Sequence, residues 1–164
     1  MSHEADTDGL SQAAKLARAE VRRRAVLSAG ATLVPLPGLD IAVDLGALVS
    51  MFNTINRIFY LSPEQMAQLN TEDRIALFKA MSHVGSMFAG KYVSSAMVLG
   101  FVKQVGARWA SGRVARWVPV IGQGTAAALS YGMFTWLGES HIKECLAIRR
   151  EAKLLMLTHT KEEA

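Results

Sequence analysis

Two short segments that contain proline and glycine, one in each half of the chain, constrain its fold more than any other sequence feature. They are LVPLPGLDIAVD (33–44) and WVPVIGQG (117–124), and both carry a Val-Pro-x-x-Gly framework between two apolar runs. Proline fixes φ and lacks a backbone donor, whereas glycine accepts conformations that other residues avoid. Each segment therefore predicts a sharp turn into a new helix. We expect helical hairpins with two structural hinges, formed by Pro35, Pro37 and Gly38 and by Pro119 and Gly122.

The pattern along the chain predicts an all-α fold. Hydrophobic residues make up 51% of the 164 residues and charged residues only 20%. No stretch alternates polar and apolar residues for long enough to build a sheet. We expect a compact bundle of about six helices with two apolar hairpins. It would form one domain over residues 1–164, with residues 1–9 and 159–164 as frayed tails.

The first helix is predicted over residues 10–28, with Asp6 and Asp8 as candidate caps. Glu20 precedes Arg24 by four residues, a spacing that favours an ion pair on the helix surface. The apolar stripe of this helix is expected to comprise Leu10, Ala14, Ala17, Val21 and Ala25.

The next helices are marked by caps. A helix from the first hinge is expected to reach about Leu61, and the Ser62-Pro63-Glu64-Gln65 sequence predicts a capping box that starts a short helix. Asn70 to Asp73 resemble a further cap, after which a helical pattern runs through residues 85–91 and stays apolar to about residue 102. The stripe of that pattern is Ile75, Phe78, Met81, Gly85 and Phe88. The last helix is predicted over residues 139–158, with His141, Cys145, Ile148, Ala152 and Leu155 on one face.

The motifs that resemble catalytic or binding sites do not predict catalysis. Residues 85–91 (GSMFAGK) fit the spacing of a phosphate-binding loop, but Tyr92 stands where magnesium binding needs Ser or Thr. The stretch also lies in a helical pattern and not after a strand. The four histidines lack metal-site spacing, and Cys145 lies on an apolar stripe where a buried thiol is the usual role. We expect no enzyme activity, no cofactor and no metal site.

Asp40 and Asp44 lie one turn apart near the start of the second predicted helix. Paired carboxylates can bind a metal, but no further ligand is near them in the sequence. Carboxylates in the first turns of a helix favour its dipole. Asp44 is surrounded by apolar neighbours, so we expect a buried charge that needs a cation from another helix.

Basic residues form two short patches beside apolar runs, in a chain of formal net charge +4. They are not clustered on one face with base-reading side chains, so we expect no nucleic-acid partner. The patches suit contact with anionic lipid, and they equally suit the solvated faces of packed helices. We take as candidate membrane or partner contacts Arg22, Arg23, Arg24, Arg108, Trp109, Arg113, Arg116 and Trp117.

Residues 117–138 contain no charge, which is long enough to cross a bilayer. The proline and glycines at the start of this stretch shorten its uninterrupted part, and burial in a protein core explains it as well. The acidic, polar start of the chain lacks the features of a signal peptide. We therefore expect a cytoplasmic protein that is peripheral to, or inserted in, the inner face of a membrane.

The chain resembles a known family at LVPLPGLDIAVDLGALV, LSPEQM and VPVIGQGTAAALSYGMFTWLGES. It is similar to the helical C-terminal domain of the immunity-related (interferon-inducible) GTPases, and to bacterial helical domains attached to Era-like GTPases. The matching positions are Pro35, Pro37, Gly38, Ala42, Val43 and Asp44 in one segment and Pro119 and Gly122 in the other. The resemblance implies an α-helical module that associates with membranes. The GTP-binding domain of that family has no counterpart before Leu33, so GTP hydrolysis is not expected to carry over.

Three functions remain open from the sequence. The first is a non-enzymatic, membrane-associating module of bacterial type that docks to a separate GTPase or oligomerises at an anionic membrane. The second is a soluble helical module that binds a protein partner or itself. The third is a pore-forming effector or its immunity protein, in which helices at 84–102 and 117–138 insert as a hairpin.

Overall fold

The computed structural model describes residues 2–31, 39–110 and 123–162, with side chains described at 8–30, 45–104 and 127–157. These residues form helices and connecting loops without any strand, which confirms the all-α prediction. The helices are α1 (Ser2–Ala31), α2 (Leu39–Ile58), α3 (Pro63–Ala67), α4 (Thr71–Val84), α5 (Ser95–Ala110) and α6 (Gln123–Glu162).

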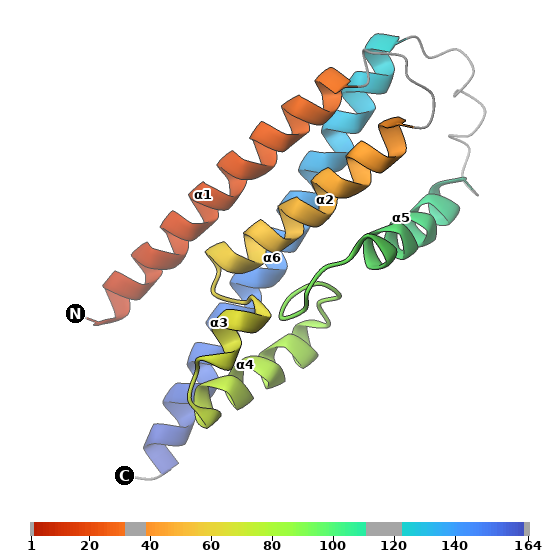
Figure 1. Cartoon of the computed structure of the whole chain (residues 1–164). Coiled ribbons are helices and arrows are strands. Elements are labelled where there is room, and N and C mark those ends of the chain that lie inside the picture. The colour runs from red at the N-terminus through yellow and green to blue at the C-terminus, as the bar shows by residue number, and fades with distance from the viewer. Residues whose placement is uncertain (1, 32–38, 111–122, 163–164) are drawn as a thin grey trace.

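Helix α6 runs along the whole length of the bundle (Figure 1). Helix α1 packs antiparallel to its first half, α4 packs on its second half, and α2 lies between α1 and α5. The core fills the space between α1, α2 and α6 and continues toward α4. Its largest fully buried side chains include Phe52, Phe59, Phe134, Ile142 and Ile148.

The predicted stripe of α1 is confirmed. Ala14, Ala17, Val21 and Ala25 are buried, and Leu10 packs against the core from its edge. Small side chains bring α1 close to α6, so close that a Cβ at Gly138 would collide with the side chain of Val21. The predicted start was wrong, because α1 begins at Ser2. Asp6 and Asp8 therefore lie within the first turns of the helix, where negative charge favours its dipole, and not at its N-cap.

The predicted caps between α2 and α4 are confirmed. Gln65 N–H donates to Ser62 Oγ (3.4 Å), Ser62 N–H donates to Gln65 Oε1 (3.3 Å), and Pro63 opens α3. Asn70 Oδ1 accepts from Asp73 N–H at 2.8 Å and caps α4. These contacts satisfy amide donors that a helix start leaves without partners.

Helix α2 ends in a Schellman motif that the sequence did not reveal. Leu61 N–H donates to Asn56 O (2.8 Å) and Tyr60 N–H donates to Arg57 O (3.1 Å). Tyr60 takes the left-handed conformation, with φ 56°, at a position where glycine is usual. The motif directs the chain from α2 straight into α3.

The helical pattern predicted through residues 85–91 was wrong. Helix α4 ends at Val84, and Gly85 caps it with φ 70° while its N–H donates to Met81 O. Residues 85–94, the 85–94 loop, separate α4 from α5. The predicted stripe was also partly wrong, because Ile75 and Phe78 are exposed whereas Ala76, Leu77 and Ala80 face the core. The side that packs on α6 is lined by smaller residues than the pattern suggested.

The predicted start of the last helix was wrong as well. Helix α6 runs without interruption from Gln123 to Glu162, because Gly138 packs inside the α1–α6 contact instead of ending a helix. The predicted face is confirmed, since His141, Cys145, Ile148 and Ala152 are buried and Leu155 packs against the core.

Candidate functional site

The structure describes the side chains of only one of the two predicted basic patches. Arg22, Arg23 and Arg24 lie in the C-terminal third of α1. Side chains that lie outside the described residues are those of Asp44 in α2 and of Arg108 and Trp109 in α5. Also outside the described residues are Arg113, Arg116, Trp117, Pro35, Pro37, Gly38, Pro119 and Gly122.

Glu20 holds two of the three arginines. Its carboxylate accepts from Arg23 Nε and Nη2, both at 3.0 Å, and from Arg24 Nε at 2.6 Å. The hydrogen bond from Arg23 is the main cause that lowers the pKa of Glu20, against the opposing effect of burial. The predicted pair of Glu20 with Arg24 is therefore confirmed, and Arg23 joins it.

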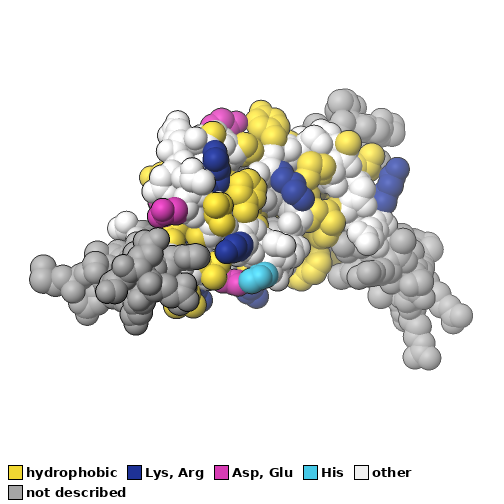
Figure 2. Space-filling view, turned by 90° about the horizontal axis from the view of Figure 1, so that it is seen from below, with side chains coloured by type: hydrophobic (Ala, Val, Ile, Leu, Met, Phe, Trp, Pro, Cys, Tyr) yellow, Lys and Arg dark blue, Asp and Glu magenta, His cyan; other side chains and the backbone are white. Residues whose placement is uncertain are grey.

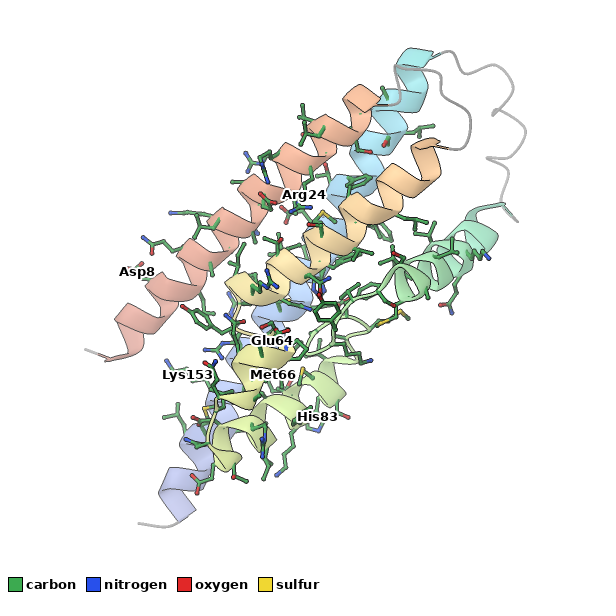
Figure 3. The ribbon with its side chains drawn as sticks, viewed as in Figure 1. Asp8, Arg24, Glu64, Met66, His83 and Lys153 are labelled. Atoms are coloured by element: carbon green, nitrogen blue, oxygen red, sulfur yellow. The ribbon has the colours of Figure 1, made fainter. Side chains whose placement is uncertain are left out.

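Arg24 reaches from α1 across to α2 (Figure 3). Its Nη1 lies 3.4 Å from Ala47 O and its Nη2 lies 3.4 Å from Thr54 Oγ1. Arg22 and Arg23 are exposed. The cluster of three arginines and one glutamate thus presents net positive charge at the surface of α1.

An exposed apolar stripe on α6 was missed by the sequence analysis. Leu129, Met133 and Trp136 recur at i, i+4 and i+7 and are 58%, 43% and 49% exposed. The residue that follows each of them, Ser130, Phe134 and Leu137, is buried and faces the bundle. We call these three exposed residues the α6 stripe. Residues 123–138 are all uncharged, so no charged face marks the outward side of this part of the helix.

The α6 stripe and the arginines lie at the same level of the bundle. Ser28 Oγ is 2.9 Å from Ser130 Oγ, and Arg18 Nε donates to Glu139 at 3.1 Å, so the end of α1 runs antiparallel beside residues 130–139 of α6. Arg22 follows Arg18 by one helical turn. Positive charge and exposed apolar surface therefore occur at the same level of the bundle.

A buried polar cluster lies farther along α6. Asn56 Nδ2 donates to Phe88 O (2.9 Å) and contacts Lys91 O (3.4 Å), and Asn56 Oδ1 accepts from His141 Nε2 (2.9 Å). Because an amide oxygen only accepts, His141 Nε2 carries the proton in this bond. The cluster ties the 85–94 loop to α2 and α6 in the interior of the protein.

Glu144 extends this cluster toward the surface. Burial opposes ionisation of its carboxyl group, but hydrogen bonds with His141 and with Ser86 Oγ (2.7 Å) prevail and lower the pKa of Glu144. Cys145 is fully buried beside His141, with Sγ 3.7 Å from Nε2. Burial, and then the charge of Glu144, raises the pKa of the Cys145 thiol far above its usual range. A thiol in this state is a poor nucleophile.

The 85–94 loop does not offer a phosphate cradle, although it is no longer part of a helix. Several of its amides bond within the protein: Ala89 N–H donates to Ser86 Oγ, Gly90 N–H to Leu61 O and Val93 N–H to Asn53 Oδ1. A phosphate-binding loop needs such amides to point at the ligand. The spacing of residues 85–91 is therefore explained by packing.

The opposite end of the bundle has a more mixed surface. Ile75, Phe78, Leu154 and Leu157 are exposed there, but charged residues of α4 and α6 stand between them. Figure 2 shows hydrophobic, basic and acidic side chains interspersed over the described part of the face seen from below. His83 Nδ1 and Glu151 Oε1 are paired at 2.6 Å across α4 and α6.

Within the part of the chain that the structure describes, no helix has an apolar stretch long enough to cross a membrane. The described residues also contain no group of three or more His, Cys, Asp or Glu side chains placed to hold a metal ion. Comparisons of the chain with models of protein families, with curated proteins and with solved structures found no match. The resemblance to the helical domain of immunity-related GTPases stays a prediction.

Proposed function

We propose that this protein is a non-enzymatic helical module that associates with anionic membranes through the α6 stripe and the arginines of α1. The observation that carries the proposal is the exposure of Leu129, Met133 and Trp136 at the same level of the bundle as the arginines of α1. Apolar side chains next to arginines match the acyl and headgroup layers of an anionic leaflet.

The magnitudes support reversible, peripheral binding. Burying a large apolar side chain contributes about 1.5–3 kcal/mol, and a basic residue near an anionic surface contributes about 1 kcal/mol. Neither contribution alone gives stable attachment, whereas the two together do, as for lipid anchors that act with a basic patch. Trp136 is suited to the interface because its ring is apolar and its N–H can reach water or a headgroup.

Co-flotation of the purified chain with neutral and anionic vesicles, at low and high salt, tests the proposal. We expect flotation with anionic vesicles that high salt weakens, because salt screens the arginines. Three tryptophans are present, so a variant with Trp109→Phe and Trp117→Phe isolates Trp136. Its fluorescence should be quenched by brominated lipids. Absence of flotation under all conditions would remove the membrane function.

A protein-binding module is the second candidate. It is favoured by Ile75 and Phe78 of α4, which are 48% and 55% exposed at the end of the bundle away from the three arginines. A protein partner, including a separate GTPase or a second copy of this chain, would cover them without any need for lipid. Self-association that is lost with Phe78→Ser and kept with Met133→Ser would favour this function.

The pore-forming function has less support from the fold. It required one continuous helix over residues 84–102, and the 85–94 loop divides that stretch. Asn53 and Asn56 hold this loop in the bundle through hydrogen bonds to its backbone. Insertion would have to break these bonds, and no observation on the described residues favours that step.

A further inference from the structure

A hollow lies between α1 and α2 beside the arginine cluster. It has a volume of about 280 Å³ and is lined by Arg23, Arg24, Leu27, Ser28 and Ala47. The small side chain of Ala47 leaves this space open, and none of the described residues that line it is acidic. One wall is therefore cationic and the other is apolar.

The guanidinium groups are already positioned by Glu20. Arg23 uses Nε and Nη2 for that carboxylate, and Arg24 uses Nε. A guanidinium has five N–H donors, so both arginines retain donors for a second anion. The Nη contacts of Arg24 to Ala47 O and Thr54 Oγ1 are long, at 3.4 Å each. An anionic oxygen in the hollow would form shorter, charge-assisted bonds with the same atoms.

We propose that this hollow binds the phosphomonoester group of an amphiphile, such as the headgroup of an acidic lipid. Arg23 and Arg24 bind the phosphate oxygens, because the planar fork of arginine matches phosphate geometry. The hydrocarbon part leaves over Leu27, which is 62% exposed, and over Ala47. The proposal rests on the membrane association proposed above, and it adds a lipid preference that charge alone does not give.

The first test compares vesicles that contain phosphatidic acid with vesicles that contain phosphatidylglycerol, matched in zeta potential. We expect roughly tenfold tighter binding to phosphatidic acid, the value of one or two charge-assisted hydrogen bonds. Equal binding to both vesicles would overturn the lipid preference while the general membrane association stands.

Three variants separate the hollow from general electrostatics. Arg23→Gln removes a charge that lines the hollow, and Arg22→Gln removes the same charge one residue away, outside the lining. Both should weaken binding to phosphatidylglycerol equally, but only Arg23→Gln should remove the excess for phosphatidic acid. Ala47→Met fills the hollow without a change in charge and should also remove that excess. Loss of the excess in Arg22→Gln to the same degree would overturn the proposal.

A soluble titration keeps the test independent of vesicles. Dihexanoyl phosphatidic acid below its micelle concentration should shift the amide NMR signals around Ala47 and Leu27 in the wild type, and not in Ala47→Met. Inorganic phosphate alone should bind at least tenfold more weakly, because it lacks the apolar part. Equal affinity for inorganic phosphate would overturn the amphiphile assignment. This titration decides the proposal even if the chain floats with no vesicle at all.

Discussion

The two halves of α6 differ in what they expose. One outward line of the helix carries Leu129, Met133 and Trp136 in the first half, and continues with Ser140, Lys143 and Arg150 in the second. On the inward side, the second half buries the polar side chains of His141 and Cys145 among apolar neighbours. The exposed apolar residues are thus contiguous along the outward line in the first half, whereas in the second half Ser140, Lys143 and Arg150 separate them from the exposed Leu154.

This difference indicates which part of α6 determines the fold and which part is available to bind another surface. Buried polar groups require partners in fixed positions, so Asn56 and His141 select one arrangement of α2, α6 and the 85–94 loop. Exposed apolar groups lower the free energy of unfolding only slightly, but they favour association with another surface. We infer that the second half of α6 secures the fold and that the first half is free to bind.

The largest expected effect is a loss of stability when the buried polar cluster around His141 in the second half of α6 is disrupted. Asn56→Leu keeps the volume but leaves Phe88 O and His141 Nε2 without their partner, and each buried unsatisfied group costs about 1–3 kcal/mol. We expect a loss of about 3 kcal/mol or more in the free energy of unfolding, measured with urea. Asn53→Leu is the control, because Asn53 bonds Val93 at a half-buried position that water can reach, and it should cost about 1 kcal/mol. Equal losses in the two variants would contradict the importance of burial.

The next largest effect is on vesicle binding through the α6 stripe in the first half of α6. Met133→Glu places a charge in the α6 stripe and should reduce the free energy of vesicle binding by about 2 kcal/mol, through loss of an apolar contact. Folding should be unaffected, since Met133 is exposed. Leu154→Glu is the control on the same line of α6, about 27 Å farther along the helix than Trp136. It should bind vesicles like the wild type, and similar weakening in both variants would break the distinction between the halves.

The junction between the halves is Gly138. Gly138→Ala should lower stability by about 1–2 kcal/mol, because the added Cβ collides with Val21 in the α1–α6 contact and overpacking exceeds the gain in helix propensity. Gly132→Ala, six residues earlier, meets nothing within 4 Å and should stabilise the protein by up to about 1 kcal/mol. Thermal unfolding of both variants gives the opposite signs; equal signs would show that α1 and α6 separate at little cost.

The helix caps and the buried face of the second half of α6 were easier to predict from the sequence than the exposed stripe in its first half. Capping residues act over three or four positions, so Ser62 with Gln65 and Asn70 with Asp73 could be recognised from spacing alone. The stripe of His141, Cys145 and Ile148 was also clear, because charged residues occupy the other faces of that part of α6. Local chemistry and a strong contrast between faces are both visible in one chain.

The features that the sequence missed depend on tertiary packing. The sequence pattern predicts a helix through Gly85, but this residue caps α4 in the left-handed conformation, and Asn53 and Asn56 hold the loop that follows through long-range hydrogen bonds. Residues 123–138 contain no charge, so nothing in their pattern distinguished Met133 from the buried Phe134. The hollow at Ala47 exists only because α1 and α2 are placed side by side.

The smallest effect at neutral pH concerns Cys145, whose buried thiol makes the stability of the protein depend on pH in the alkaline range. Burial raises the pKa of Cys145, so its contribution to stability is complete below the unfolded pKa near 8.5 and declines as pH rises above it. The stability difference between wild type and Cys145→Ala should be constant to about pH 8. It should then fall by about 1.4 kcal/mol for each pH unit, because only the unfolded thiol ionises. A constant difference up to pH 10 would contradict this.

The same thiol chemistry allows a direct comparison of the two halves of α6. In the native wild type, Cys145 should react with a thiol reagent only through unfolding, since the side chain is fully buried. A cysteine introduced by Met133→Cys in the Cys145→Ala background should react at the rate of an exposed thiol. Vesicles that bind the α6 stripe should slow that reaction and leave the reaction of Cys145 in the wild type unchanged. Protection of both thiols would mean that vesicles stabilise the whole bundle, and protection of neither would mean that the α6 stripe stays in water.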